Sequence, residues 1–345
     1  MKAQKLILFF CSFLCLLLPL QADVRPLLKK PAAWFTTEEA RQIAANVLSQ
    51  QSPRGDWPKN GDTTRLYTGN PAQLQGTFDN GATVNELRFL AKMFEATKDA
   101  KYERAFLKGL DHILNAQYPS GGWPQTSPPG PNYPRHITFN DNTMLNLMQL
   151  LREVAELHLY SFVDKERRAK AQTAFDKGIE CILQCQIKVN GNLTVWCAQH
   201  DEITFEPRAA RAFELVSFSG FESVGLTRLL MSLDKPSHRV QQAVRAAMNW
   251  FEKSKLNGVK VEKREDENAE KGYDLFVVAD PNASPLWARF YDIQTNQPIF
   301  VSRDGVPRTQ LADISYERRT GYAWYGDWPA KLEKEYQAWS DRRLK

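Results

Sequence analysis

The sequence predicts a mainly α-helical fold, an incomplete α/α barrel of repeated helix pairs with a small irregular, β-containing C-terminal part. Three observations predict it: an internal repeat, a helical spacing of apolar residues within each copy, and a change of pattern after about residue 257. Helix pairs that recur every 60 to 70 residues or so must bury their apolar stripes against neighbours. A few such pairs can curl, which would gather the equivalent loops around one cleft.

The repeat has two alternating elements. The first covers residues 77–90 and returns 61 residues later at 138–151, and a third copy starts at 217–220. The second element ends in glycine and tryptophan and lies between these copies, at 47–58, 113–124 and 182–196. The chain therefore alternates two kinds of segment.

Apolar residues in these segments follow the spacing of an amphipathic helix. In the first copy they are Val84, Leu87, Leu90 and Phe94, and the second copy repeats the spacing from Met144. The glycine and proline clusters that follow the second element end a helix and force a loop. These segments are therefore expected to be amphipathic helices and not strands.

The pattern changes toward the C-terminus. Residues 260–274 are densely charged and are expected to form a solvated loop. Turn residues bound three short apolar runs, at 275–278, 286–291 and 299–302, which predict strands. Residues 332–339 predict a closing helix. We expect one domain over residues 23–345, with a helical body at about 34–257 and an irregular cap at about 258–330.

The first 22 residues predict a secretory signal peptide. Lys2 and Lys5 precede an apolar run at 6–20, and Ala22 provides a small residue before a cleavage site at Asp23. The apolar run is short for a membrane span, and no later segment has enough apolar residues for one. We expect a secreted or periplasmic protein with no membrane attachment after cleavage, and an uncleaved anchor is the alternative.

The cysteine content leaves two possibilities. After cleavage only Cys181, Cys185 and Cys197 remain, which permits at most one disulfide or three buried thiols. Metal binding is not expected, because no histidine accompanies them at ligand spacing.

The composition excludes several classes of protein. With 43% hydrophobic residues in 345, disorder and a disulfide miniprotein are ruled out. Removal of two lysines with the signal leaves 43 basic against 40 acidic residues, which does not suggest nucleic-acid binding. We expect a monomer.

Acidic and amide residues stand at the start of the first two copies, as Asp79 with Asn80 and as Asn140 with Asp141. One interpretation is helix capping by their side-chain oxygens. The other is a cation site, since a curled arrangement would bring Asp79, Asn80 and Asp141 to one rim. Oxygen ligands without histidine or thiolate suit Ca²⁺. A helix N-terminus disfavours a cation, so an anionic ligand would have to compensate.

Arginines in the second half suit an acidic substrate. Arg211 precedes the third copy, while Arg289 and Arg303 lie in the C-terminal part. Each alone is an ordinary surface or ion-pair arginine by composition. A cluster of them would bind a uronate polymer, because the guanidinium fork matches a carboxylate.

Several motifs occur in a fixed order along the chain. They are residues 77–87, 121–125 (GGWPQ), 137–142, 207–214, 289–305 and 317–326 (ERRTGYAWYG). In these motifs the chain resembles the pectate lyases of the tenth polysaccharide lyase family, and the similarity runs from about Trp34 to Trp328.

The resemblance implies an α/α-barrel enzyme that cleaves polygalacturonate by Ca²⁺-assisted β-elimination and leaves 4,5-unsaturated products. It places Asp79, Asn80 and Asp141 at the calcium site and makes Arg303 the Brønsted base. Arg211 and Arg289 would bind uronate carboxylates, and Tyr322 would line a sugar subsite. Val301 and Ser302 depart from the small residues expected before Arg303.

Two other functions fit part of the pattern. An α/α-barrel glycoside hydrolase would use Asp79 and Asp141 as its acid and base. A non-catalytic pectin-binding protein would use only the aromatic and arginine contacts. An assay for unsaturated ends separates both from a lyase.

Overall fold

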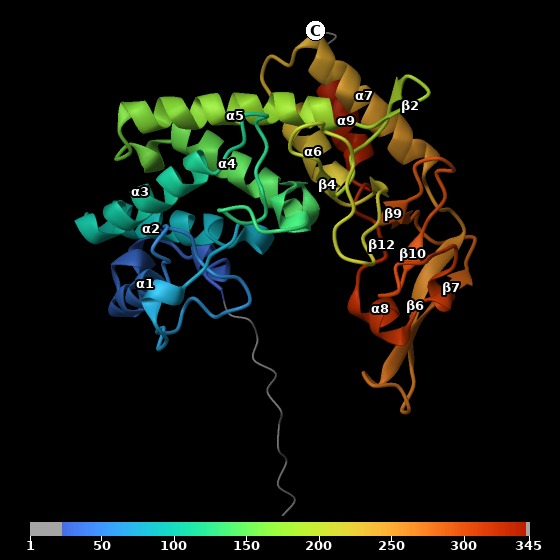
Figure 1. Cartoon of the computed structure of the whole chain (residues 1–345), viewed down its shortest axis with the longest axis horizontal. Helices are drawn as coiled ribbons and strands as arrows, with labels where there is room; N and C mark the ends of the chain where they lie inside the picture. The colour runs from blue at the N-terminus through green and yellow to red at the C-terminus, as the bar shows by residue number, and fades with distance from the viewer. Residues whose placement is uncertain (1–22, 343–345) are drawn as a thin grey trace, which may run out of the picture.

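The computed structural model describes residues 23–342, and the chain is mainly α-helical there (Figure 1). The predicted alternation of helices is confirmed, with the pairs α2/α3, α4/α5 and α6/α7 following one another. The helices of the repeats are α1 (Glu38–Ser49), α2 (Val84–Thr97), α3 (Ala100–Asn115), α4 (Thr143–Glu156), α5 (Lys165–Cys185), α6 (Glu222–Met231) and α7 (His238–Lys253).

One glutamine ties each repeat to the next. Gln51, Gln117 and Gln186 occupy equivalent places after α1, α3 and α5, and each side-chain amide donates to two backbone carbonyls. One carbonyl lies in the following turn and the other in the next odd-numbered helix. The acceptors are Gly55 and Ala105 (3.0 and 2.9 Å), Gly121 and Ala174 (2.9 and 2.8 Å), and Thr194 and Ala243 (2.8 and 2.9 Å).

A tryptophan closes each turn back onto its helix. Trp57, Trp123 and Trp196 are fully buried. Their indole nitrogens donate to the carbonyls of Val47, Ile113 and Ile182 at 2.7, 2.9 and 2.7 Å. The indole thus fills the core and satisfies a helix-terminal carbonyl at once.

The turn glycines are required by close packing. Gly55 and Gly121 have φ of +111° and +90°, and a Cβ on either would come within 2.6 and 2.3 Å of the carbonyl oxygens of Lys108 and Lys177. The glycine clusters of the first two copies therefore let their turns pack directly on the next helix.

The helices of the repeats begin in two ways. Thr37, Asp99, Asp164 and Ser237 cap α1, α3, α5 and α7 with their side chains. No side chain caps α2, α4 or α6. These three N-termini follow Phe78, Phe139 and Phe218, which occupy equivalent places in the three copies of the first repeat element. The candidate cation ligands lie in the first two of these copies.

Short strands join the repeats to the C-terminal part. β1 (Ile137–Thr138) pairs with β4 (Gln199–His200), and β5 (Phe218–Ser219) pairs with β9 (Phe290–Tyr291), all antiparallel. The other short strands are β2 (Lys188–Val189), β3 (Asn192–Leu193), β8 (Trp287–Ala288), β10 (Phe300–Val301), β11 (Pro307–Arg308) and β12 (Tyr325–Gly326).

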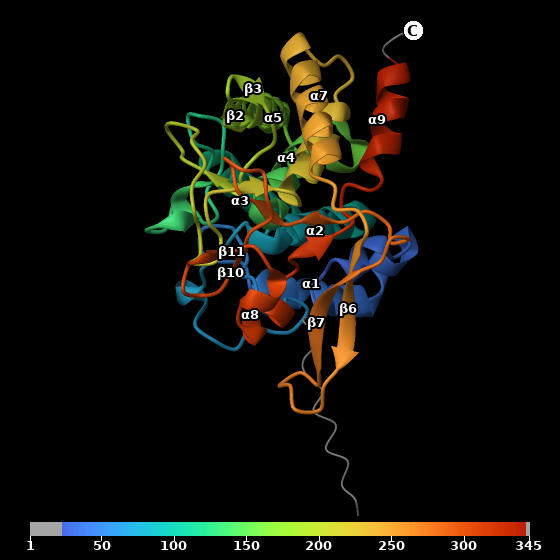
Figure 2. The same ribbon diagram turned by 90° about the vertical axis from the view of Figure 1, so that its right-hand side faces the viewer.

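The prediction of a charged loop at residues 260–274 was wrong. A hairpin of β6 (Val259–Glu265) and β7 (Tyr273–Ala279) stands there and projects from the body (Figure 2). Valine and charged residues alternate only at the start of β6, whose last four residues are all charged. Lys263 and Arg264 lie over the rings of Tyr273 and Phe276 at 4.0 and 4.7 Å. These cross-strand contacts give a solvated ribbon its order.

The other C-terminal predictions are confirmed. The three apolar runs contain β7, then β8 with β9, then β10, and the closing helix is α9 (Leu332–Asp341). A short helix, α8 (Tyr316–Gly321), precedes it. A second, smaller core lies under this part, built around Phe213, Phe290, Phe300 and Trp324.

The cysteines and the N-terminus complete the comparison. Cys181, Cys185 and Cys197 are buried free thiols, which is the second of the two alternatives for them. Within residues 23–342 no helix is both long and apolar enough to cross a bilayer. The expected signal peptide at 1–22 lies outside the described residues.

Candidate active site

Two short 3-10 turns bring the first and second copies together. Asp79–Gly81 precedes α2 and Asn140–Asn142 precedes α4. Asn80 and Asp141 both have left-handed backbone, with φ of 54° and 50°. The two residues line one pocket of about 310 Å³, the cleft pocket, together with Arg25, Asn85, Asn146 and Phe221.

Capping does not explain these side chains. The helices begin later than expected, at Val84 and Thr143, and none of the acidic or amide groups of the two turns caps them. Thr83, a β-branched residue, is held at φ of 70° before α2, and its hydroxyl accepts from Trp57 N and donates to Thr77 O, both at 2.9 Å. Left-handed and β-branched outliers of this kind cluster at functional sites.

Asp79 lies behind the cleft pocket. It is 1% exposed, and its Oδ2 accepts from Lys59 Nζ and, at 2.7 Å, from Gln125 Nε2. Its Oδ1 is buried and has no hydrogen-bond partner among residues 23–342. A buried carboxylate oxygen without a donor is costly, so this atom is suited to a ligand that supplies positive charge.

Asp141 belongs to an ion-pair network. Arg289 Nη2 donates to Asp141 Oδ1 at 3.1 Å and to Glu222 Oε1 at 2.6 Å. Asn140 Nδ2 donates to the other oxygen of Asp141 at 2.8 Å. The side chain of Glu222 is fully buried and that of Arg289 is 7% exposed, whereas that of Asp141 is 27% exposed. Asp141 is thus the member of this network that meets solvent.

Three aromatic rings enclose the guanidinium of Arg289. Its Cζ lies 4.7 Å from the ring centres of Phe221 and Tyr322 and 5.8 Å from that of Phe290. Burial lowers the pKa of Arg289, but the charges of Glu222, Tyr322 and Asp141 outweigh it and raise the pKa above its ordinary value. Arg289 is therefore a fixed cation.

Arg211 also lies against the ring of Tyr322. Its guanidinium pairs with Glu214, through Nε at 2.7 Å and also through Nη2, and the Tyr322 hydroxyl donates to Glu214 Oε1 at 2.8 Å. Burial lowers the pKa of Arg211, but the hydrogen bond and the charge of Glu214 outweigh burial and raise the pKa above its ordinary value. The structure thus brings Arg211, Arg289 and Tyr322 into one cluster.

Arg303 stands at the edge of this cluster. Its guanidinium pairs with Glu317, at 3.0 and 3.2 Å, and its side chain is 67% exposed. Its Cζ lies 5.8 Å from the ring of Phe213, and that of Arg211 lies 5.0 Å from the same ring. Bonds from Arg318 and Arg303 lower the pKa of Glu317 to about 2. Arg303 is thus next to Arg211 but makes no contact with Asp79 or Asp141.

The residues that sequence reasoning missed are the partners of the predicted ones. They are Lys59 and Gln125 on Asp79, Glu222 on Arg289, and Glu214 on Arg211 and Tyr322. Gln125 and Glu214 lie inside recognised motifs, so they carried a signal. No sequence signal marked Lys59 or Glu222, because their partners lie 20 and 67 residues away and local sequence does not indicate such pairs.

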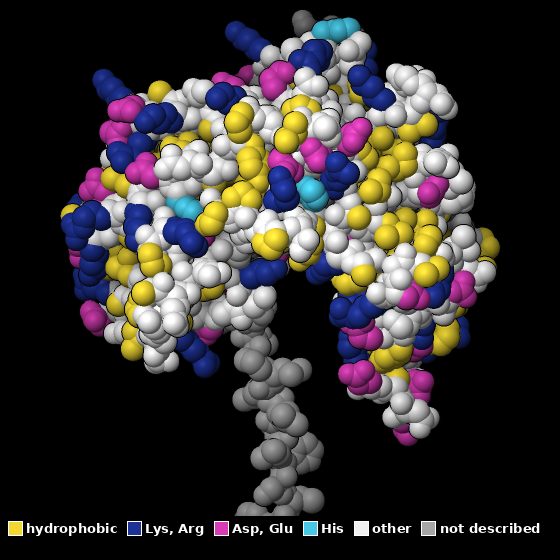
Figure 3. Space-filling view, in the orientation of Figure 1, with side chains coloured by type: hydrophobic (Ala, Val, Ile, Leu, Met, Phe, Trp, Pro, Cys, Tyr) yellow, Lys and Arg dark blue, Asp and Glu magenta, His cyan; other side chains and the backbone are white. Residues whose placement is uncertain are grey.

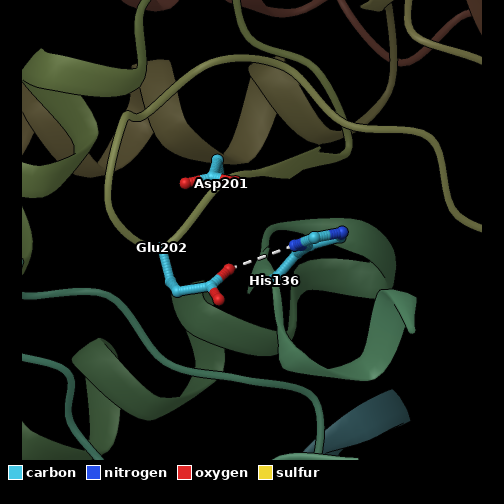
Figure 4. A group of neighbouring side chains, drawn as sticks. All are labelled: His136, Asp201 and Glu202. Atoms are coloured by element: carbon cyan, nitrogen blue, oxygen red, sulfur yellow. Dashed lines mark hydrogen bonds and ion pairs between the residues drawn. The ribbon is translucent and has the colours of Figure 1, made fainter. Parts of the chain in front are cut away.

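A second group of potential metal ligands lies apart, at His136, Asp201 and Glu202 (Figure 4). His136 Nδ1 lies 3.1 Å from Glu202 Oε2, and Arg135 also bonds this glutamate. Asp201 accepts from Arg208 and from the backbone amides of 203 and 204, and these bonds, led by the one from Thr204, lower its pKa. Protein donors already satisfy these carboxylates, so the group orders two loops.

The molecule is hollowed on one side. Figure 3 shows the hollow between the part that carries α1 and the part that carries the β6–β7 hairpin, with Lys and Arg side chains at its edge. In Figure 1, α1 and α2 lie on one side of this hollow, and β10 and α8 lie on the other. The arrangement suits an extended anionic ligand.

The oxygen atoms of the two turns can hold a hard cation. Asp79 Oδ1 and Asn140 Oδ1 are both buried without a hydrogen-bond partner in the described chain, and Asp141 is partly open. Carboxylate and amide oxygens are the ligands that calcium and magnesium prefer. Lys59 and Arg289 already neutralise part of this charge, so cation binding there needs an anionic ligand as well.

Comparison with known proteins places the chain in a family. A family model described as pectic acid lyase matches residues 51–333. A family 10 polysaccharide lyase from Cellvibrio cellulosa is similar in structure, with 36% identity and a TM-score of 0.78 over 90% of this chain and 96% of that one. A mutant of that lyase, solved with trigalacturonic acid, gives the same identity and TM-score over 89% and 97%. Among curated proteins none matches. The chain belongs to the pectic acid lyase family and is a polysaccharide lyase.

Proposed function

We propose that this lyase is a pectate lyase that cleaves de-esterified polygalacturonate by calcium-assisted β-elimination and leaves 4,5-unsaturated ends. The observation that carries the proposal is the pair of Arg289 and Asp141, which puts a buried cation and an open oxygen ligand 3.1 Å apart. A uronate carboxylate can bind the guanidinium directly, and a cation held by Asp141 would give it a second positive partner. The trigalacturonic acid bound by the related lyase supports the same substrate class.

The resemblance assigns substrate binding to Arg211, Arg289 and Tyr322, and we keep that role for Arg289 and Tyr322. Arg289 is held in place by Glu222 and three rings, so it loses little freedom on binding a carboxylate. Tyr322 lies between the two arginines and offers a flat surface for a sugar ring. Arg211 can turn from Glu214 to a second carboxylate.

Asp79, Asn80 and Asp141 are the residues that would hold calcium. Calcium there would withdraw charge from the uronate carboxylate and make the neighbouring C5 proton more acidic. Asp79 contributes the buried oxygen without a partner, and Asn80 and Asp141 contribute groups that line the cleft pocket.

The base is an arginine, for which the resemblance names Arg303. The surroundings favour Arg211. Arg303 is mostly exposed, and water stabilises its charged form. Arg211 is less exposed, faces the tyrosine beside Arg289, and is close enough to Asp141 for that charge to affect its pKa. Both arginines have carboxylate partners that raise the pKa, so proton abstraction requires an alkaline medium and further positive charge nearby.

The hydrolase alternative has less support. A pair of catalytic carboxylates must both face the sugar. Asp79 is 1% exposed, is held by Lys59 and Gln125, and does not line the cleft pocket. Membership of a lyase family also argues against the hydrolase and against a protein that only binds pectin.

The remaining expectations follow from the same proposal. A polymer too large to enter a cell requires an exported enzyme, in agreement with the signal peptide expected at 1–22, and we propose that this enzyme acts as a monomer. The repeated glutamine bonds, each of which links one helix pair to the next, support the incomplete α/α barrel.

The test is the ultraviolet absorbance of unsaturated ends released from polygalacturonate at alkaline pH, with calcium or with a chelator. We expect release with calcium and loss of it with the chelator. New reducing ends without ultraviolet absorbance would show hydrolysis and overturn the proposal. Binding of the polymer without either signal would show a pectin-binding protein.

A further inference from the structure

A second pocket, the side pocket, adjoins the cleft pocket. It measures about 240 Å³ and is lined by Arg25, Lys59, Asn60, Thr63, Asn85 and Glu86, among others. Arg25, Asn80 and Asn85 line both pockets. A polymer substrate bound at Asn80 and Asp141 can therefore continue directly into the side pocket.

The side chains of the side pocket match a charged sugar. Arg25 and Lys59 supply positive charge, and the carboxyl groups of Asp23 and Glu86 also line the pocket and supply acceptor oxygens. The amides of Asn60 and Asn85 and the hydroxyl of Thr63 can donate hydrogen bonds to sugar hydroxyls and accept them. No aromatic ring is among its described lining residues, so the pocket is not built to stack a neutral sugar. Its chemistry suits a uronate residue.

Glu86 provides an independent sign of a ligand. It is 3% exposed, and Thr63 Oγ1 donates to its Oε1 at 3.0 Å. Its Oε2 is buried and has no hydrogen-bond partner in residues 23–342. A hydroxyl group in the pocket would satisfy this oxygen.

Arg25 is free to change its partner. It pairs with Asp23, two residues away, and the guanidinium side chain is 61% exposed. An exposed local pair of this kind contributes little to stability. A carboxylate in the side pocket can replace Asp23 at small cost. Lys59, by contrast, is held by Asp79 and bridges the side pocket to the calcium ligands.

We propose that the side pocket is a further sugar subsite of this lyase, in which Arg25 binds the carboxylate of a uronate residue beyond those held in the cleft pocket. This inference rests on the proposed function. Arg25 then sets how strongly a longer substrate is preferred over a short one, and it takes no part in the bond cleavage.

The test compares kcat/KM for hexagalacturonate and for the shortest oligomer that the enzyme cleaves. The variant Arg25→Gln is expected to lower the value for the hexamer about ten-fold or more, the effect of losing a hydrogen bond to a charged group, and to leave the short oligomer unchanged. Arg25→Lys keeps the charge and is expected to lose less. Arg41→Gln, an exposed arginine of α1 that also has an acidic partner, is the matched control.

Each result decides the matter. An equal loss on both substrates would assign Arg25 a structural role, and no loss on either would leave the side pocket without a sugar; both overturn the proposal. If the wild type releases no unsaturated product, the proposed function has failed. Calorimetry with hexagalacturonate in a chelator then decides the subsite alone: binding that needs Arg25 supports it, and binding that does not, or no binding, overturns it.

Discussion

Arg289 and Asp141 are 148 residues apart in sequence and are joined by a hydrogen bond of 3.1 Å. The bond attaches the irregular C-terminal part to the start of the second helix pair. Glu222, from the third pair, accepts from the same Nη2 atom at 2.6 Å. Three segments of the chain therefore meet on one guanidinium, and the site is complete only when all three have folded.

The Arg289→Met variant should be strongly destabilised. Glu222 has no exposed side-chain surface, so loss of Arg289 leaves a buried charge without its partner, at a cost of about 3–5 kcal/mol. Urea unfolding measures this. The double variant with Glu222→Gln should recover most of the loss, because the buried charge is then absent.

The matched control is Arg228→Met. Arg228 pairs with Glu335, and both side chains are about 40% exposed, so the cost should stay below about 1 kcal/mol. Equal losses in the Arg228 and Arg289 variants would contradict the network as described.

Substitution of the two candidate bases by lysine should separate them. Replacement of the true base lowers kcat by about 10²–10⁴-fold, and what remains should follow a pH profile shifted to lower pH, since lysine loses its proton near 10.4 and arginine above about 12. We expect both effects for Arg211→Lys. Arg303→Lys should keep most of kcat and an unshifted profile.

Initial rates of unsaturated-product formation across alkaline pH give both quantities. A shifted profile in the Arg303 variant alone would restore Arg303 as the base and assign Arg211 to substrate binding. A rise in KM without a change of profile would indicate a binding role for the residue concerned.

Sequence reasoning reached the helix pairs because they repeat. Gln117 and Trp123 stand at fixed places after α3, and their equivalents make the same contacts in each copy, so a periodic pattern reports a periodic structure. Local chemistry failed at residues 260–274, where a densely charged segment forms a hairpin. Lys263 and Arg264 lie over rings of the partner strand, which composition does not reveal.

The sequence indicated which residues belong to the site but not which contacts they make. Asn80 and Asp141 line the same pocket because both residues have left-handed backbone. The sequence does not predict this conformation, because adjacent Asp and Asn residues are equally suited to a helix cap. The pairing of Lys59 with Asp79 and of Glu222 with Arg289 depends on tertiary packing alone.

The repeated glutamines should be worth more to stability than their polar character suggests. Gln117→Ala removes the shared donor of the carbonyls of Gly121 and Ala174, and each carbonyl left without a partner costs about 1–3 kcal/mol. Urea unfolding should show a clear loss. Gln172→Ala removes a glutamine of similar burial in α5 whose bond to Asp176 is exposed, and it should change stability by under about 0.5 kcal/mol. Comparable losses would mean that the link between repeats carries little of the fold's stability.

Glu86 should make the protein less stable as pH rises through the neutral range. Burial raises the pKa of its carboxyl to about 7, against an ordinary value of 4.5. Between these two values the folded state binds more protons than the unfolded state, so the free energy of unfolding falls as pH increases and levels off above about 7. A shift of this size corresponds to about 3 kcal/mol.

Glu86→Gln removes the titrating group and should flatten this part of the profile. The measurement is urea unfolding at pH 5 and at pH 8 for the wild type and the variant. Glu38→Gln, at a residue whose side chain is 86% exposed, should keep the wild-type slope. If the Glu86 variant keeps that slope as well, another group loses the proton, and the assignment to Glu86 is wrong. In the alkaline medium of the proposed reaction, which lies above this pKa, the carboxyl is ionised, and its Oε2 atom in the side pocket is an acceptor for a sugar hydroxyl.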